Sequence, residues 1–203
     1  MNETTIAYPG EEGFFGNLPW GKLMMWVFLA SDVMGFASLI AGYFYLRMLS
    51  VDWPDSGELL NVMLTSINTV FLLSSSFTMA WAVDAIKRND QRAMLRQLGI
   101  TIFLGTLFLL IQGYEYFELF DLFSETFDER PFSGHLFAST FFLLTGFHAF
   151  HVFVGLVYLG CISVAAARGR YSAENYLALD IAGLFWHFVD WVWVAVFLSL
   201  YII

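Results

Sequence analysis

Charged residues, cysteines and prolines are all scarce in this sequence. Lys, Arg, Asp and Glu together make up 13% of the 203 residues, whereas a soluble domain usually carries about 25%. The one cysteine, Cys161, excludes an intrachain disulfide and a metal cluster built from cysteines. Lys and Arg number nine against 18 Asp and Glu, so the chain lacks the basic face that nucleic acid binding needs. These scarcities argue against an ordinary soluble enzyme and against a nucleic-acid-binding protein.

Long apolar runs take the place of the missing charge. Hydrophobic residues are 59% of the chain, and the mean hydropathy is +0.67. A helix needs about 20 apolar residues to cross a bilayer, and five runs reach that length: 20–49, 59–86, 94–118, 134–167 and 176–203. We therefore predict an all-α integral membrane protein, a bundle of five transmembrane helices in one domain over 20–203. Residues 1–19 have no Lys or Arg, so we interpret them as a tail and not as a signal peptide.

The basic residues predict how the chain is oriented in the membrane. If the helices alternate in direction, seven of them fall on one side: Lys22, Lys87, Arg88, Arg92, Arg96, Arg168 and Arg170. Only Arg47 and Arg130 fall on the other. The excess predicts an amino terminus in the cytoplasm and a carboxyl terminus outside. The outer loops are acidic and contain Asp52, Asp55, Glu58, Asp121, Glu125, Asp128 and Glu129.

Ionisable residues lie near the middle of three runs. Asp32 is about 18 Å into the first run at ~1.5 Å per residue. Similar depths hold for His148 and His151 in the fourth run and for His187 and Asp190 in the fifth. A charge at the bilayer centre costs at least ~2.5–3.5 kcal/mol by insertion scales, so these groups should face protein or trapped water. We expect them to form one interior cluster, which Asn68 in the second run could join.

Several roles are open to these groups. His148 and His151 could be two metal ligands, but a zinc or iron site needs three or four, so we favour interhelical hydrogen bonds and expect no metal. His187 and Asp190 resemble a base and its orienting carboxylate, but no nucleophile accompanies them, so we expect no catalytic residue. Asp32 is either a protonated donor that bridges helices or part of a proton path, and we favour the bridge.

Two further features concern helix packing. Small residues in the first run form a stripe that lets helix backbones approach closely. The stripe consists of Ser31, Gly35, Ser38 and Gly42. Because Asp32 lies beside it, we expect the carboxyl group to point into a packed seam. Glu115, near the outer end of the third run, is either an interfacial acid or part of a specific interhelical bond.

Four motifs, in order along the chain, resemble subunit III of haem–copper respiratory oxidases. Residues 186–193, WHFVDWVW, resemble its last-helix signature, and residues 146–152, GFHAFHV, resemble its Gly-x-His-Gly-x-His-Val stretch. Residues 30–34, ASDVM, are similar to its Ser-Glu or Ser-Asp motif, and residues 112–116, QGYEY, to the acid of its third helix. The chain resembles the five-helix form, although Ala149 replaces the usual Gly and Trp191 the usual Val.

The resemblance implies a subunit that binds no redox cofactor, with haem and copper held by the partner. It implies packing against oxidase subunit I and other subunits, structural phospholipids between helices, and a location in a bacterial cytoplasmic membrane. It also implies support of proton uptake and of resistance to inactivation during turnover. The residues assigned to that role or to an interhelical polar cluster are Asp32, Glu115, His148, His151, His187 and Asp190.

Two other readings of the sequence stay open. The first is an accessory subunit of a nitric oxide reductase cluster, which only its partner would distinguish. The second is a small proton-coupled transporter, which usually has broken helices. All four prolines lie outside the apolar runs, which disfavours the transporter.

Overall fold

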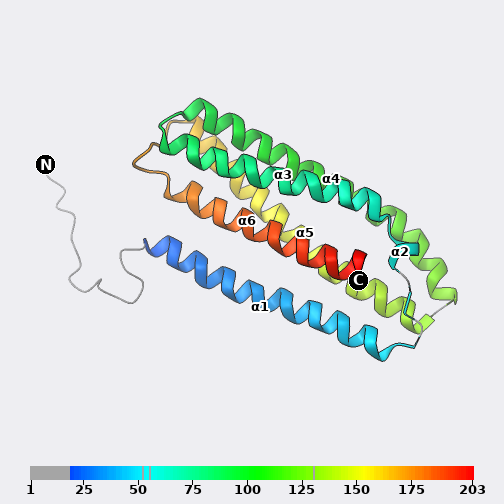
Figure 1. Cartoon of the computed structure of the whole chain (residues 1–203). Coiled ribbons are helices and arrows are strands. Elements are labelled where there is room, and N and C mark those ends of the chain that lie inside the picture. The colour runs from blue at the N-terminus through cyan, green and yellow to red at the C-terminus, as the bar shows by residue number, and fades with distance from the viewer. Residues whose placement is uncertain (1–18, 52, 55, 130) are drawn as a thin grey trace, which may run out of the picture.

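The computed structural model describes residues 19–51, 53–54, 56–129 and 131–203, apart from the side chains of 56, 58 and 121–134. The elements are helices α1 (Trp20–Leu49), α2 (Ser56–Leu59), α3 (Val62–Lys87), α4 (Gln91–Glu129), α5 (Pro131–Ala167) and α6 (Leu177–Phe197), followed by a π-helical turn η1 (Leu198–Ile202) (Figure 1). Within those residues the only β-type pairing is an isolated bridge between Ser172 and Asn175.

Five helices are long and apolar enough to cross a membrane, which confirms the predicted fold class. They cover Trp20–Leu49, Val62–Lys87, Gln91–Phe120, His135–Ala167 and Leu177–Ile202. The second span starts later than predicted because Asn61 caps α3, its side chain accepting a hydrogen bond from the backbone of Leu64 at 3.1 Å. α4 runs past its predicted end because residues 119–129 contain no Pro or Gly.

The helices pack around α6. α6 contacts α1, α3 and α5, while α4 packs between α3 and α5. In Figure 1, α1, α6 and α3 lie side by side across the view, and α5 lies behind α6. In an 18-residue apolar window of the span Leu177–Ile202, 50% of the residues are buried, but in one of Trp20–Leu49 only 11% are, so α1 is peripheral.

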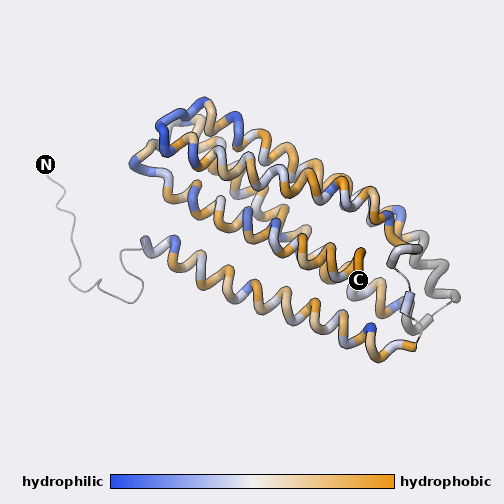
Figure 2. The backbone as a smooth tube through the Cα atoms, viewed as in Figure 1, coloured by the Kyte–Doolittle hydropathy of each residue, from blue (hydrophilic) through white to orange (hydrophobic). Residues whose placement is uncertain are grey.

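One end of the bundle is markedly hydrophilic (Figure 2). The loops that follow α3 and α5 and the start of α1 lie there. The seven basic residues that predicted the orientation therefore gather at this end, although the side of the membrane that it faces stays a prediction. Arg47 lies at the opposite end. The predicted loop residue Arg130 and the seven loop acids have side chains outside the described residues.

Candidate functional site

Three polar contacts, each at a different depth, hold the peripheral helix α1 to the rest of the bundle. They join Lys22 to Asp180 (2.5 Å), Asp32 to His151 (3.0 Å) and the Arg47 side chain to the carbonyl of Ile203 (2.7 Å). The outer two lie near the helix ends, where water can reach them. The contact between Asp32 and His151 lies in the middle of the span and is the candidate functional pair.

The contacts of the two His151 ring nitrogens define how this pair can hold protons. Nδ1 lies 2.7 Å from the carbonyl oxygen of Phe147, and a carbonyl only accepts, so Nδ1 carries a hydrogen. Nε2 lies 3.0 Å from Asp32 Oδ2, an ion-pair distance without the alignment of a hydrogen bond, since Oδ2 has no hydrogen-bond partner among the described residues. One proton between these two atoms gives either a neutral acid with a neutral imidazole or a carboxylate with an imidazolium. Both forms of the pair have zero net charge, which suits a site inside a membrane.

Aromatic rings surround the His151 imidazole. The ring centroids of Phe147, Phe36, Phe150 and Phe185 lie 4.6, 5.4, 6.0 and 6.5 Å away. These rings shield the pair from most of the surrounding lipid, since the side chains of Asp32 and His151 are only 14% and 10% exposed. Low access by water strengthens the electrostatic interaction between the two groups.

His148 occupies a different environment from His151. It is fully buried, with its ring centroid 4.8 Å from that of Trp193 in a tilted arrangement and 5.9 Å from that of Phe108 in an edge-on one. Neither ring nitrogen has a hydrogen-bond partner within the described part of the chain. The interhelical hydrogen bonds expected for His148 are therefore not formed there, because aromatic rings fill the space around it. No group of three His, Cys, Asp or Glu side chains able to hold a metal occurs among the described residues.

His187 pairs with a serine of α3 and not with Asp190. Ser76 Oγ lies 2.5 Å from His187 Nδ1. Asp190 is 2% exposed and interacts with Ser76, but neither of its carboxyl oxygens has a hydrogen bond of good geometry to a described residue. The resemblance of His187 and Asp190 to a base and its orienting carboxylate is therefore not matched by a direct contact, because Ser76 interacts with both side chains. We call Ser76, His187 and Asp190 the α3–α6 polar group.

The expected single cluster is thus divided into separate groups. Asp32 meets His151 between α1 and α5, whereas the α3–α6 polar group lies on the other side of α6. Asn68, in α3, is buried, and its side chain donates to the carbonyl of Phe108 at 3.2 Å. Equal depth in the membrane does not bring these groups together because they project from different faces of their helices.

Glu115 forms an interhelical centre near the far end of the bundle. It is 2% exposed and accepts hydrogen bonds from Thr65 of α3 at 2.7 Å, Gln112 of α4 at 3.1 Å and Tyr201 of η1 at 3.2 Å. The structure therefore places Glu115 in the interhelical arrangement and not at the lipid interface. Its carboxyl group ties the carboxyl-terminal turn to two other helices.

The small-residue stripe of α1 does not pack within this chain. A Cβ added at Gly35 or Gly42 would meet nothing within 4 Å, and Ser31 and Ser38 are exposed and bond carbonyls of their own helix. The expected close packing of this stripe is therefore not formed within the chain, although the Asp32 carboxyl group does point into a seam, the one between α1 and α5. The stripe faces away from the bundle because other residues of α1, such as Phe36, make the internal contacts.

Close helix approach occurs instead at two glycines that the sequence did not single out. A Cβ at Gly105 would lie 2.7 Å from Trp186, and one at Gly155 would lie 3.0 Å from it. α4 and α5 thus hold the fully buried Trp186 of α6 between them. The sequence signal was weak because each glycine is isolated within its helix.

Two grooves flank α6 on the face that it shares with α1 and α3. The groove between α3 and α6 measures about 470 Å³ and is lined by residues that include Ser76, Phe77 and Asp190. The groove between α1 and α6 measures about 430 Å³ and is lined mainly by apolar residues. His187 and Trp191 line both grooves and form the ridge between them.

Comparison with known proteins gives a consistent family relationship. A family model described as cytochrome c oxidase subunit III matches residues 16–203. A protein named cytochrome c oxidase subunit 3 from Thermostichus vulcanus is 37% identical over 178 residues, covering 87% of this chain and 84% of the relative. One from Synechocystis sp. is 35% identical over 198 residues, covering 96% and 81%. The human one is 31% identical over 186 residues, covering 87% and 67%.

Proposed function

Because this chain belongs to the cytochrome c oxidase subunit III family and so forms part of a multi-subunit oxidase, we propose that it is the non-catalytic subunit that stabilises catalytic subunit I and supports its proton uptake. It binds no redox centre itself, and haem and copper reside in subunit I, its main contact. Phospholipids bind between its helices. Family membership favours this role over a nitric oxide reductase accessory subunit and over a transporter.

The contact between Asp32 and His151 carries this proposal. Oδ2 and Nε2 lie 3.0 Å apart, and transfer of a proton between them, which needs a small rotation of one side chain to align a hydrogen bond, leaves the net charge of the pair unchanged. A bilayer interior that disfavours isolated charge therefore tolerates both positions of the proton. The pair bridges α1 to α5 in either form, so its first role is structural, and the shared proton gives it a second role beside a proton-uptake path.

The basic end of the bundle supports a specific orientation. We place the ends of α3 and α5 and the start of α1 in the cytoplasm of a bacterial cell, because basic residues are retained on that side. Proton uptake from the cytoplasm would then begin at this end. Cysteine labelling from either side of sealed vesicles tests the orientation, and labelling of Arg88→Cys from outside the cell would overturn it.

The function is tested by purifying the chain in a mild detergent from its own membranes and recording a reduced-minus-oxidised optical spectrum. Haem bands and a large histidine-rich membrane partner are expected. A colourless chain that purifies alone would contradict the role beside subunit I. In the same complex, Asp32→Asn should leave the haem spectrum and initial turnover unchanged but shorten the working lifetime. An altered haem spectrum, or an unchanged lifetime, would contradict the role of Asp32.

A further inference from the structure

We propose that the face of α1, α6 and α3 receives a transmembrane helix of another oxidase subunit, and that this helix brings a hydrogen-bonding side chain to His187. This inference rests on the proposed function, because it names the surface through which the subunit meets its complex. We call this surface the α6 face, defined by the two grooves and the ridge of His187 and Trp191.

The first argument is an imidazole at mid-membrane depth. His187 lies about 15 Å from the start of α6 at ~1.5 Å per residue, within a span of 26 residues. Its Nδ1 is used by Ser76, and no hydrogen bond from the described chain reaches its Nε2. The side chain is half-buried and borders both grooves. Lipid chains offer no hydrogen bond at this depth, so a protein partner is needed to satisfy Nε2.

The second argument is the neighbouring tryptophan. Trp191 is 75% exposed and lies one helical turn beyond His187, about 21 Å into the span. Exposed tryptophans normally lie at the membrane interface, where the indole N–H can meet water or headgroups. At this depth it can meet neither. A covering helix would bury the ring and offer a partner to the N–H.

The third argument is the shape of the α6 face. Helices pack by inserting the ridge of one into the groove of another. His187 and Trp191 are four residues apart and form such a ridge, with grooves of about 470 and 430 Å³ beside it. A lipid chain could fill a groove, but it would leave the polar atoms of the ridge, His187 Nε2 and the Trp191 indole N–H, without partners.

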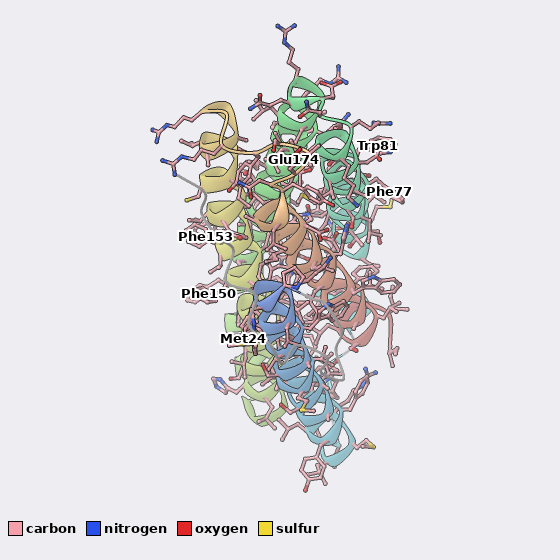
Figure 3. All side chains as sticks on the ribbon, turned by 90° about the vertical axis from the view of Figure 1, so that its left-hand side faces the viewer. Met24, Phe77, Trp81, Phe150, Phe153 and Glu174 are labelled. Atoms are coloured by element: carbon pink, nitrogen blue, oxygen red, sulfur yellow. The ribbon has the colours of Figure 1, made fainter. Side chains whose placement is uncertain are left out.

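The outward face of α5 provides the contrast. Phe150 and Phe153 project outward from α5, as Figure 3 shows, and the exposed neighbours Val154 and Val157 are also apolar. Side chains of this kind are satisfied by lipid alone. Phe77 projects outward from α3 in the same figure and borders the groove beside Asp190. Phe77 and Phe153 are therefore a matched pair, 68% and 55% exposed, on the two faces.

Photocrosslinking in native membranes uses this pair. A benzophenone-bearing amino acid is placed at position 77 or at position 153 in the full oxidase. We expect position 77 to crosslink to another subunit and position 153 to crosslink to lipid. Crosslinks to a subunit from position 153 alone would overturn the proposal, as would crosslinks only to lipid from both positions. A haem-containing partner that still co-purifies would then show that the proposed function stands and only the assigned face fails.

Replacement of His187 gives a second measurement. His187→Phe keeps a ring of similar size but removes the hydrogen bond. Hydrogen bonds between membrane helices are worth about 0.6 to 2 kcal/mol, so the chain should leave the detergent-solubilised oxidase about three- to thirtyfold faster. Phe153→Leu is the control and should not change this rate. Equal rates for His187→Phe and the unaltered chain would contradict the role of His187 in docking.

Discussion

Gly105 of α4 lies so close to Trp186 of α6 that an added Cβ would be only 2.7 Å from the indole ring. Distances below 3.0 Å require something to move, and Trp186 is fully buried, so the ring has no free space to enter. A Cβ added at Gly155 of α5 would lie 3.0 Å from the same ring. The Trp186 ring therefore sets the spacing between α4, α5 and α6.

Gly105→Ala should therefore destabilise the bundle, although alanine is the better helix former. Overpacking of a well-filled core costs about 1–3 kcal/mol, which exceeds the helix-propensity gain of about 1 kcal/mol. Unfolding in mixed detergent micelles, followed by circular dichroism, measures the change. Gly35→Ala is the control, since its Cβ would meet nothing within 4 Å, and it should unfold at the same point or slightly later. Equal stability of the two variants would contradict the steric argument.

Glu115 predicts a second stability effect, because three donors converge on its carboxyl group. Glu115→Leu would leave Thr65, Gln112 and Tyr201 without this acceptor. A buried group left unpaired costs about 1–3 kcal/mol, so the variant should lose at least that much stability. The same detergent titration measures it.

Two control variants compare the stability lost with one hydrogen bond to that lost with all three bonds of Glu115. Tyr201→Phe removes a single bond and should lose only about 0.5–1.5 kcal/mol. Tyr114→Phe removes a bond to Glu118 on the lipid-exposed side and should have no measurable effect. If Tyr114→Phe were as destabilising as Glu115→Leu, the special position of Glu115 would be disproved.

The contact of Lys22 with Asp180 predicts a weak, salt-dependent effect. Both side chains are about a quarter exposed (28% and 23%), and pairs of this kind contribute about 0–1 kcal/mol. Lys22→Glu should loosen the start of α1 and speed proteolysis there, and the exchange Lys22→Asp with Asp180→Lys should restore protection. Because salt screens such pairs, the difference should shrink in 1 M salt. A difference of equal size at low and high salt would argue against an electrostatic cause.

The helices could be predicted from the sequence, but most of their contacts could not. Length and apolarity alone define a membrane span, and so all five spans were found. Pairing depends on how each helix is rotated and which helix lies beside it. Ser76 is one of three consecutive serines, and nothing in the sequence marks it as the partner of His187.

The spacing of small residues in α1 led to a wrong expectation, because such a stripe can pack against its own chain or against another one. The stripe of Ser31, Gly35, Ser38 and Gly42 permits close packing, but spacing does not say whether the partner is in the same chain. Asp32 was singled out by its depth alone, whereas its contact with His151 depends on α1 lying against α5. The depth of a residue can be counted along the chain, whereas helix order cannot.

The contact between Asp32 and His151 predicts that the stability losses from changing each partner alone do not add up in the double variant. Asp32→Leu would leave His151 Nε2 unpaired beside apolar rings, at a cost of about 1–3 kcal/mol. In the double replacement Asp32→Leu with His151→Leu no polar group is left over, so its loss should be smaller than the sum of the two single losses.

Asp32→Asn should be nearly as stable as the unaltered chain, because Nδ1 carries the hydrogen and Nε2 can accept one from the new amide. A detergent titration of the four variants measures the coupling, and strict additivity would mean that the two side chains do not interact. The stability of Asp32→Asn therefore separates the bridge from the shared proton, since only the proton is lost in that variant.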